Sequence, residues 1–447
     1  MTVLYAVGKL SVMTCSSALD SISKSYLDCW LEDCENSLPS TSNQSALSIP
    51  YQRWFKFKEA FAPSFVVETI KRLPKKPARC LDPFGGSGTT ALTCQFLGIE
   101  SATIETNPFL ADLIKSKVTR YDVNELRYSS LIVSRRAKRN IGINTLENYF
   151  PGAPQTFVQP GDGKRWIFNQ EVAQALVALR AEINEIANTN HRRFLRVMLG
   201  SKLVEISNVV VNGKGRRYRR SWAEKSQTVV DVFRAFDESC KTGLTDLEVF
   251  GRRPHVKSRV FRGDARQLIK SVGSVDLVLT SPPYPNSFDY TDIYNLELWA
   301  LGYLTSRSDN RSLREKTIRS HVQIAHEKQL NESLPPALRT TYRALVKRRS
   351  NLWNYRIPEM VCHYFEDIRK VLTGCREILR EDGCIVMAVG NSRYCGVLID
   401  VPKILSEMVG PLGFQFLGRE SVRSMRSSAQ QGGRRVLDES LVWLRHK

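Results

Sequence analysis

The hydrophobic positions of this 447-residue chain fall into two patterns. Short continuous apolar runs, notably 275–279 and 384–389, predict strands that are buried on both faces. Apolar residues at helical spacing predict helices between such strands. The other elements predicted in this way are helices over 91–97, 359–380 and 401–408 and an antiparallel strand pair at 414–416 and 441–444. Strands that alternate with helices indicate an α/β fold with a doubly wound, mostly parallel sheet and an antiparallel closing strand.

One long segment, 118–255, interrupts this alternation. Apolar residues recur at helical spacing over 172–186, a further helix is predicted over 221–237, and 192–211 reads as mixed helix and turn. We therefore expect an inserted, mainly helical domain. The predicted organisation is an irregular or short helical extension at 1–50, one half of the sheet domain at 51–117, the insert at 118–255, and the other half at 256–447, which includes a basic excursion at 301–358.

A glycine-rich turn follows the first predicted strand, in the sequence CLDPFGGSGTT at 80–90. Glycines allow a sharp turn and let a ligand approach the backbone without a Cβ in the way. The turn lacks the Lys-Ser/Thr of a phosphate-binding loop and the third glycine of a dinucleotide fingerprint. Glu105 ends the next apolar piece, roughly 20 residues later, where a carboxylate can accept both hydroxyl protons of a ribose. A helix-start loop and a surface glutamate would explain each feature separately, but together they favour a nucleoside site.

Two further polar positions follow predicted strands. Asp264 comes after a glycine turn, where it can accept a hydrogen bond from an exocyclic amine or cap a helix. The apolar run 275–279 leads directly into TSPPY at 280–284. Neither proline has an N–H for a sheet ladder, so the chain must leave the sheet at its carboxyl edge, where open α/β sheets place their ligands. The pattern indicates a nucleoside cofactor beside a reactive planar amine.

These motifs resemble those of the amino-group DNA methyltransferases, which use S-adenosylmethionine to modify cytosine N4 or adenine N6. The resemblance covers about 51–117 and 256–447 and implies a Rossmann-like methyltransferase sheet. The cofactor-binding residues that it implies are Lys56, Phe61, Pro63, Asp82, Pro83, Phe84, Gly86, Ser87, Gly88, Thr89, Glu105, Asp264, Ala265 and Thr280. The catalytic residues that it implies are Ser281, Pro282, Pro283 and Tyr284. One departure is that the insert precedes Asp264, so either the insertion point differs from the usual one or Asp264 is not part of the site.

The residues of the SPPY motif suit this reaction. An exocyclic amine is a poor nucleophile because its lone pair is delocalised into the ring, and acceptors aimed at its protons shift the nitrogen toward sp³ geometry. The Ser281 hydroxyl and the Pro282 carbonyl are such acceptors, and Tyr284 can stack on the base. The chemistry is then mostly positioning and electrostatics, and the base must be flipped out of a duplex. Serine in the first place of the motif is associated in this family mainly with cytosine N4. Cytosine C5 chemistry is set aside because no Pro-Cys pair occurs.

Charge points to a polyanionic partner. Lys and Arg number 65 against 45 Asp and Glu, a net charge of +20, which predicts strongly salt-dependent binding of nucleic acid. The positive residues cluster at 135–139, 214–220 and 343–349, and the second cluster reads as a glycine-containing loop. The residues that we expect to contact double-stranded DNA are Lys214, Arg216, Arg217, Arg219, Arg220, Arg348 and Arg349. A solvated charged loop is the alternative interpretation. Within 301–358, the aromatic residues Tyr342, Trp353 and Tyr355 either stack on unpaired bases or pack the excursion onto the core.

The ten cysteines and six histidines show no metal-ligand spacing, so no metal site is expected, and His321 and His326 are predicted to lie on the surface. Unpaired thiols fit a reducing compartment. No apolar run approaches the ~18 residues of a membrane span, and residues 1–19 lack the basic start and cleavage site of a signal peptide. A cytoplasmic protein is therefore predicted.

The favoured interpretation is a sequence-specific methyltransferase of duplex DNA that acts on cytosine N4. From the family resemblance it would protect sites against a cognate restriction endonuclease, a functional partner. Three alternatives stay open: the same enzyme acting on adenine N6, a DNA-binding relative that keeps the fold without turnover, and an enzyme with an RNA substrate.

Overall fold

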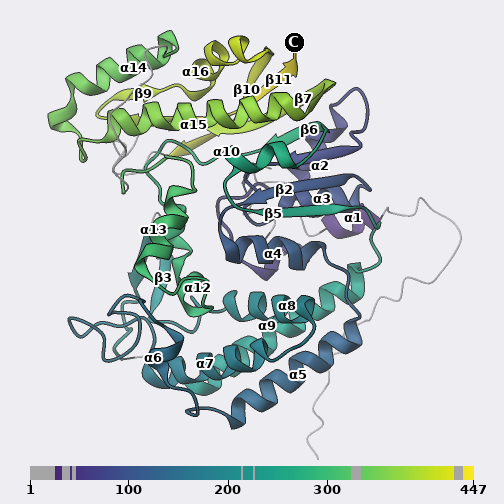
Figure 1. Ribbon diagram of the computed structural model, residues 1–447, viewed down its shortest axis with the longest axis vertical. Helices are drawn as coiled ribbons and strands as arrows, with labels where there is room; N and C mark the ends of the chain where they lie inside the picture. Colours follow the sequence, from purple (N-terminus) through teal and green to yellow (C-terminus); the bar gives the residue numbers. More distant parts are fainter. Residues whose placement is uncertain are drawn as a thin grey trace, which may run out of the picture.

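The computed structural model describes residues 26–32, 41–42, 47–212, 215–224, 227–323, 334–426 and 436–447. Within these ranges one seven-stranded sheet forms the centre of the upper part of the molecule (Figure 1), in the order β10-β11-β7-β6-β1-β2-β5. The strands are β1(Arg79–Asp82), β2(Glu100–Glu105), β5(Ser258–Arg262), β6(Val275–Thr280), β7(Leu379–Gly390), β10(Phe414–Arg426) and β11(Val436–His446). Neighbouring strands are parallel, except that β11 is antiparallel to both β7 and β10. The predicted mostly parallel sheet with an antiparallel closing pair is confirmed.

Helices cover both faces of this sheet. The helices of one face are α2(Pro63–Lys71) and α3(Thr89–Phe96), and those of the other are α10(Ala265–Leu268), α15(Ile357–Ile378) and α16(Val401–Met408). Strand β6 shows why its sequence is almost continuously apolar: Leu277 and Leu279 belong to the hydrophobic cluster of the first face, and Val278 belongs to that of the second. A strand covered on both sides has no solvent face that would favour polar residues.

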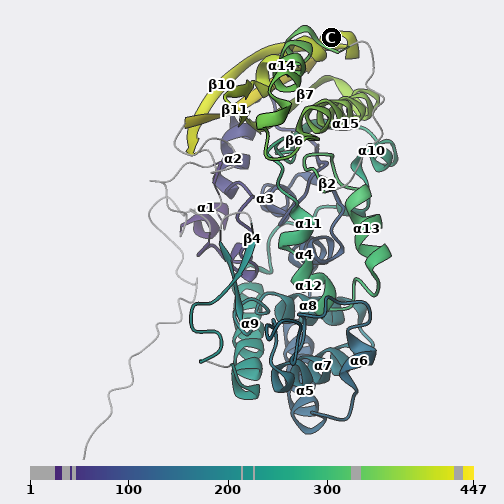
Figure 2. The same cartoon turned by 90° about the vertical axis from the view of Figure 1, so that its left-hand side faces the viewer.

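The chain leaves the sheet after α4(Pro108–Val118) and returns with β5. Between them lie α5(Val123–Arg139), α6(Leu146–Tyr149), α7(Gln170–Asn184), α8(Thr189–Gly200), α9(Val229–Phe250) and a hairpin of β3(Val209–Asn212) and β4(Gly215–Tyr218). This insert lies below the sheet in Figures 1 and 2. Because β5 pairs in parallel with β2, the insertion point lies before the strand that carries Asp264. The order of insert, β5 and Asp264 is therefore as the sequence indicated, and the assignment of Asp264 to the site stays a prediction.

Two local predictions in the insert are wrong. The segment 212–220, expected to be a glycine-containing loop, belongs largely to the hairpin, because three consecutive β-branched valines at 209–211 favour a strand. The helix expected from residue 221 begins at Val229, because Thr228 and Asp231 form a reciprocal capping box there.

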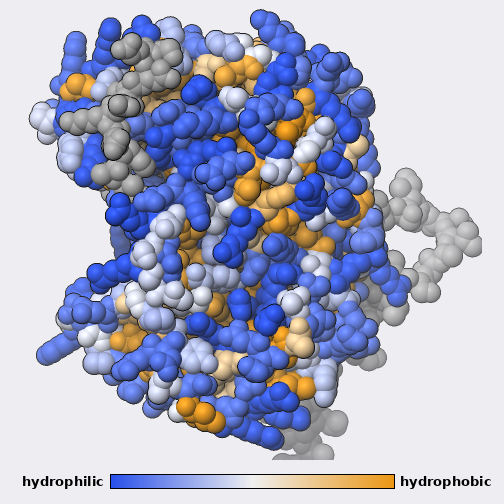
Figure 3. All heavy atoms as spheres, viewed as in Figure 1, coloured by the Kyte–Doolittle hydropathy of each residue, from blue (hydrophilic) through white to orange (hydrophobic). Residues whose placement is uncertain are grey.

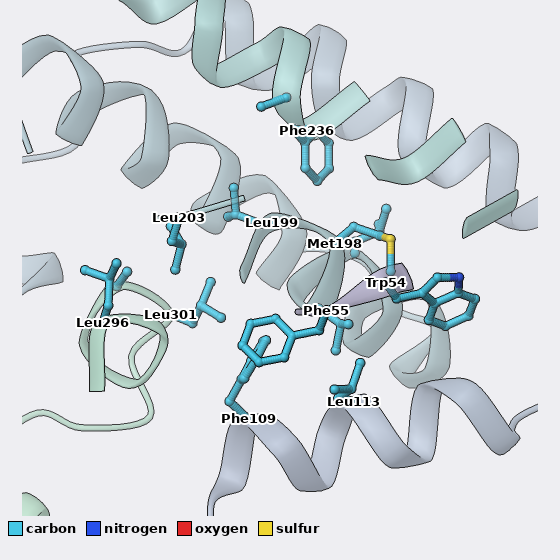
Figure 4. Close-up of a cluster of buried hydrophobic side chains, with 14 of the residues drawn as sticks. Trp54, Phe55, Phe109, Leu113, Met198, Leu199, Leu203, Phe236, Leu296 and Leu301 are labelled. Atoms are coloured by element: carbon cyan, nitrogen blue, oxygen red, sulfur yellow. The ribbon is translucent and has the colours of Figure 1, made fainter. Parts of the chain in front are cut away.

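The insert and the sheet domain share one hydrophobic core (Figure 4). Trp54 and Phe55, which precede the sheet, pack with Phe109 of α4 and with Met198 of α8. The ring of Trp54 meets Phe194 edge to face, with centroids 5.4 Å apart. Because this core is continuous, the insert is held in a fixed position relative to the sheet.

The second half of the chain adds smaller elements around the sheet. They are α11(Tyr290–Ile293), α12(Asn295–Ala300), α13(Arg307–Glu315), α14(Pro336–Lys347) and the hairpin of β8(Ser392–Tyr394) and β9(Val397–Ile399). The first helix described is α1(Tyr26–Leu31), whose Trp30 stacks on Phe96 of α3. Among the described residues, none of the helices combines the length and apolarity needed to cross a membrane.

A buried carboxylate ties the insert to the segment before the sheet. Asp246 of α9 is 1% exposed and accepts hydrogen bonds from the backbone N–H of Tyr51, from the indole of Trp54 and from Arg53. We expect Asp246→Ala to lower the free energy of unfolding by about 3 kcal/mol, because it leaves buried donors unpaired. Urea denaturation measures the change.

The matched control lies on the same helix. Asp237 forms a 3.3 Å ion pair with Lys138 at the surface, so Asp237→Ala should change the free energy of unfolding by less than about 0.5 kcal/mol. Equal losses in the two variants would contradict the structural role given to Asp246.

Candidate active site at the carboxyl edge of the sheet

Four strand ends meet at one edge of the sheet. Strands β1, β2, β5 and β6 are neighbours and parallel, so the residues that follow them open onto the same side. A cavity of about 370 Å³ lies there. The sequence-predicted residues that line it are Phe61, Asp82, Pro83, Phe84, Gly86, Thr89, Glu105, Asp264, Ala265, Ser281, Pro282, Pro283 and Tyr284. The glycine turn (83–88) and the proline turn (281–284) thus face one another across a single cavity, which is large enough for a nucleoside-sized ligand.

Five of the predicted cofactor residues lie outside this lining: Lys56, Pro63, Ser87, Gly88 and Thr280. Lys56 is exposed, and Pro63 is buried as the first residue of α2. Gly88 precedes α3 with a φ of 83°, a conformation that glycine adopts without strain. Ser87 and Thr280 contact residues around the cavity. The Ser87 carbonyl accepts a hydrogen bond from the buried Lys117 ammonium, and the Thr280 hydroxyl donates one to Asp82.

Asp82 joins β1 to β6 below the cavity. Its carboxylate accepts hydrogen bonds of 2.8 Å from the Thr280 and Thr90 hydroxyls and one of 3.1 Å from the Phe84 N–H. Burial raises the pKa of Asp82, and these three donors oppose the rise. The carboxylate therefore fixes the start of the glycine turn relative to the start of the proline turn.

The glycine turn is held close to the second strand. The Gly85 N–H donates to the Ile104 carbonyl at 3.0 Å, and Gly86 has a φ of 51°. A Cβ added at Gly86 would lie 3.0 Å from the ring of Phe57, which also lines the cavity. Only glycine leaves the backbone open to a ligand at this point.

Glu105 ends β2 with its carboxylate at the cavity. It accepts hydrogen bonds from the Gly86 N–H at 2.8 Å and from the Asn107 N–H at 2.7 Å. Burial raises the pKa of Glu105 to about 7, although these backbone donors oppose the rise. Among the described residues its hydrogen-bond donors are backbone N–H groups, so the carboxylate can accept further hydroxyl donors from a ligand.

We expect Glu105→Gln to remove a pH dependence of stability. The ordinary pKa of glutamate is 4.5, and the folded value is about 7, so the folded protein keeps a proton that the unfolded chain loses above pH 4.5. The wild type should therefore lose stability relative to the variant as pH rises from 4.5 to about 7, with no further change above that. Urea unfolding of both proteins across this range measures the difference, and a pH-independent difference would contradict the assignment.

Asp264 is a helix cap, as one of the two sequence interpretations has it, and its acceptance of an amine stays a prediction. It is the N-cap of α10, where its carboxylate accepts from the Arg266 N–H at 2.8 Å. The same carboxylate forms a bidentate ion pair with the Arg266 guanidinium, which also binds Asp367. Asp264 and Ala265 nevertheless line the cavity, so the capping residue lies where a ligand would bind.

The proline turn carries a hydrogen-bonded chain of side chains. The Ser281 hydroxyl lies 3.4 Å from the Tyr284 phenol oxygen, and that phenol donates to Glu439 at 2.5 Å. Burial and the charge of Glu439 raise the pKa of Tyr284 well above its ordinary value. The Tyr394 phenol donates to the Pro285 carbonyl at 3.0 Å and holds the turn from the side of the β8–β9 hairpin.

Several cavity residues were not predicted from the sequence. Glu439 and Arg423 come from the closing strand pair, and Glu59 accepts a hydrogen bond from Tyr294. His321 was expected on the surface, but it is buried, lines the cavity and has its Nε2 atom 3.9 Å from Asp289. Burial lowers the pKa of His321, and the carboxylate opposes this shift. His326 lies outside the described residues.

The predicted DNA-binding residues separate into two groups. Arg219 donates to the carbonyls of Ser207, Val204 and Glu205, which gives it a structural role in the hairpin. Arg349 forms a bidentate pair with Glu359. Arg216 lies 4.0 Å from Asp292. Arg217, Arg220 and Arg348 are exposed, and Lys214 lies outside the described residues.

The aromatic residues of the basic excursion differ in how far they are exposed. Tyr342 is partly buried and donates to Glu359 at 3.3 Å. Trp353 and Tyr355 remain 44% and 59% exposed, and the guanidinium of Arg356 lies over the Tyr355 ring. Packing onto the core therefore describes Tyr342, whereas Trp353 and Tyr355 leave much of their rings to solvent.

Comparison with known proteins adds an independent observation. No protein-family model matches the chain. It is 27% identical over 412 residues to Type II methyltransferase M.AvaI of Nostoc sp., covering 83% of this chain and 81% of that protein. It is 25% identical over 453 residues to Type II methyltransferase M.BsoBI of Geobacillus stearothermophilus, covering 87% of this chain and 84% of that protein. A shorter match, 33% identical over 89 residues, links 19% of the chain to 17% of Type II methyltransferase M.MjaII of Methanocaldococcus jannaschii.

Solved structures align only weakly. The alignment with the rRNA methyltransferase aviRa from Streptomyces viridochromogenes covers 95% of this chain and 94% of that chain, at 10% identity. Its TM-score of 0.28 is too low to bear on fold or function. The sheet order and the cavity therefore rest on the structure itself, and the sequence matches show that the chain is similar over most of its length to Type II methyltransferases.

Proposed function

We propose that the chain is an S-adenosylmethionine-dependent DNA methyltransferase that acts on the exocyclic N4 of cytosine in duplex DNA as part of a restriction-modification system. The observation that carries the proposal is the shared cavity, in which the glycine turn and the proline turn are tied together by the 2.8 Å hydrogen bond from Thr280 to Asp82. The similarity to Type II methyltransferases supports the reaction class and the biological setting.

The residues of the glycine-turn side fit S-adenosylmethionine, which when bound supplies a methyl group activated on a sulfonium. In this proposal the Glu105 carboxylate accepts the ribose hydroxyls, and Asp264 and Phe84 line the same cavity. The missing side chain at Gly86 leaves room for close approach, since a Cβ there would already press on Phe57. Phe61 closes the cavity from the loop before α2.

The residues of the proline turn suit an amine substrate. The Ser281 hydroxyl and the Pro282 carbonyl are acceptors for the two amine protons, and the Tyr284 ring offers a surface for the base. Prolines at 282 and 283 remove two backbone donors and fix two φ angles, so the acceptors are rigidly placed. Preorganised acceptors of this kind need no reorganisation during the reaction. Serine at the first place of the motif supports cytosine N4 as the target.

The direct test is product analysis. Duplex DNA and, in a parallel reaction at the same salt concentration, RNA are incubated with the purified protein and methyl-labelled S-adenosylmethionine, and the nucleosides are then separated by chromatography. We expect label in N4-methylcytosine. Label in N6-methyladenine alone would keep the reaction class and overturn the target, whereas label in RNA but not in DNA would overturn the substrate.

The DNA is expected to lie in the indentation between the sheet and the insert. Figure 3 shows this indentation on the left of the molecule, with mainly hydrophilic residues around it, and Figure 1 places β3 and α13 beside it and α14 above it. The exposed Arg217 lies in β4, and Arg220 comes two residues after that strand. Arg348 directly follows α14. Trp353 and Tyr355 come a few residues later, where they can stack on exposed bases.

Replacing Arg217, Arg220 and Arg348 by alanine should weaken DNA binding and lower its salt dependence. If each arginine contacts one phosphate, the slope of log K against log salt should fall by about 2.7 for the triple variant. Fluorescence anisotropy at several salt concentrations measures this slope. Arg219→Ala, which removes an arginine bound to backbone carbonyls, should reduce stability rather than the slope. An unchanged slope in the triple variant would remove these residues from the interface.

A further inference from the structure

Glu439 is a buried charge that the proposed function leaves unexplained. It lies on β11, is 2% exposed and lines the cavity beside the proline turn. Its cross-strand neighbour on β10 is Arg423, whose guanidinium donates to both carboxylate oxygens, at 2.5 and 3.1 Å. A buried carboxylate costs free energy unless it is paired, so its position in the cavity calls for a physical reason.

The hydrogen bonds connect this carboxylate to the proline turn. The Tyr284 phenol donates to Glu439 at 2.5 Å, and the Ser281 hydroxyl donates toward the Tyr284 oxygen at 3.4 Å. The order is hydroxyl, phenol, carboxylate. A hydroxyl group can donate its own proton while its oxygen accepts another. A proton taken up at Ser281 can therefore be relayed through Tyr284 to Glu439.

The other acids of the cavity lack such a connection. Asp82 accepts from Thr280 and Thr90 below the glycine turn, and Asp264 is paired with Arg266. Glu105 accepts from backbone N–H groups on the glycine-turn side, and Glu59 accepts from the Tyr294 phenol. Among the described acids that line the cavity, Glu439 is therefore the one joined to Ser281 by hydrogen bonds.

The reaction produces a proton that must leave. When the amine nitrogen forms a bond to the methyl carbon, the carbon–sulfur bond breaks and its electron pair stays on the sulfur as a neutral thioether. The nitrogen then carries two hydrogens, one methyl group and a positive charge. The proline turn itself contains no carboxylate to take the excess proton.

We propose that Glu439 receives this proton through Ser281 and Tyr284, and that Arg423 holds the carboxylate in place for the transfer. The amine proton passes to the Ser281 oxygen, the former Ser281 proton passes to the Tyr284 oxygen, and the Tyr284 proton passes to Glu439. The products are a neutral methylamino base, two unchanged hydroxyl groups and a carboxylic acid, which returns its proton to water. This inference rests on the proposed function and adds to it a route for the proton.

The energetics favour this direction. A cation on the exocyclic nitrogen of cytosine is a far stronger acid than a carboxylic acid, because loss of the proton restores delocalisation of the nitrogen lone pair into the electron-poor ring, so transfer to the carboxylate runs downhill. Transfer by positioned acid and base groups typically contributes a factor of ~10² to 10⁴ to a rate. Among the described residues, Arg423 and Tyr284 are the charged or titratable groups that contact Glu439.

The test compares three variants in single-turnover methyl transfer at saturating DNA and cofactor. Glu439→Gln keeps the shape and an acceptor for Tyr284 but removes the basic carboxylate. Tyr284→Phe keeps the ring and removes the phenol. We expect each to slow transfer by about 100-fold, and we expect the double variant to be no slower than either, because groups of one relay act as a unit. DNA affinity and the 2-aminopurine fluorescence of a flipped target should stay at the wild-type level.

Glu420→Gln is the matched control. It makes the same change on the neighbouring strand, where Glu420 forms an exposed ion pair with Arg72, and it should transfer at the wild-type rate. Tyr284→Phe keeps the test decisive if Glu439→Gln fails to fold. A wild-type rate in Tyr284→Phe, or losses that multiply in the double variant, would overturn the relay while leaving the proposed function intact. If the wild-type protein methylates no nucleic acid, both the relay and the proposed function are overturned.

Discussion

Ser281→Ala should slow methyl transfer by about 100- to 1000-fold, the loss seen when one preorganised hydrogen-bonding group is removed from a developing charge. The Ser281 hydroxyl lines the cavity and is connected to Tyr284, so alanine removes both an acceptor for the amine and the first member of the proposed proton route. Cofactor binding should be unchanged, because the glycine-turn side does not depend on this hydroxyl. Single-turnover kinetics and calorimetry of S-adenosylmethionine binding measure the two quantities separately.

Ser271→Ala provides the control for this change. Ser271 is an exposed residue before β6, so its hydroxyl has no access to the cavity. A Ser281→Ala protein that still transfers at the wild-type rate would show that the proline turn does not activate the substrate. Loss of cofactor binding together with activity would instead indicate that the turn had collapsed.

Gly86→Val should weaken binding of S-adenosylmethionine on the order of 100-fold, which is about 2.7 kcal/mol. A Cβ at this position would lie 3.0 Å from the Phe57 ring. The φ of 51° is a backbone conformation that residues other than glycine adopt with strain. The valine side chain would occupy the approach to the turn, where the Gly86 N–H also donates to Glu105. Calorimetry measures the affinity, and the far-ultraviolet circular dichroism should stay unchanged.

The matched control is Gly163→Val. Gly163 has a φ of 59°, close to that of Gly86, but a Cβ there would meet no atom within 4 Å. The two variants carry similar backbone strain, and only one places a side chain against the cavity. Equal cofactor affinities in both would contradict the position of the ligand beside the glycine turn.

The cofactor side of the site could be predicted because its signals are local. Asp82 and Glu105 end strands and Gly86 follows one within a few residues, and parallel strands bring their carboxyl ends together. The sequence also predicted the closing strands, since Phe416 does lie opposite Leu444. Glu439 carried no such signal. It reaches the cavity because β11 inserts antiparallel between β7 and β10, and its partner Tyr284 is 155 positions away.

Other misses arose because side-chain partners depend on tertiary structure. Arg217 and Arg219 are two residues apart in the same basic run, yet one is exposed and the other binds three carbonyls. His321 was predicted to lie on the surface because it is five residues from His326, off a common helical face, but the chain folds it against Asp289. The composition of a segment does not determine which of its side chains are exposed, because their partners come from elements that are distant in the sequence.

The position of the insert between α4 and β5 has a consequence for how the protein is made. As the chain emerges from the ribosome, β1 and β2 appear more than 150 residues before β5 and β6, the strands that will flank them. The intervening helices pack mainly on one another and can form first, whereas the two early strands have exposed edges until the later ones arrive. Nascent chains halted before residue 258 should therefore be prone to edge-to-edge association, and release beyond residue 280 should suppress it.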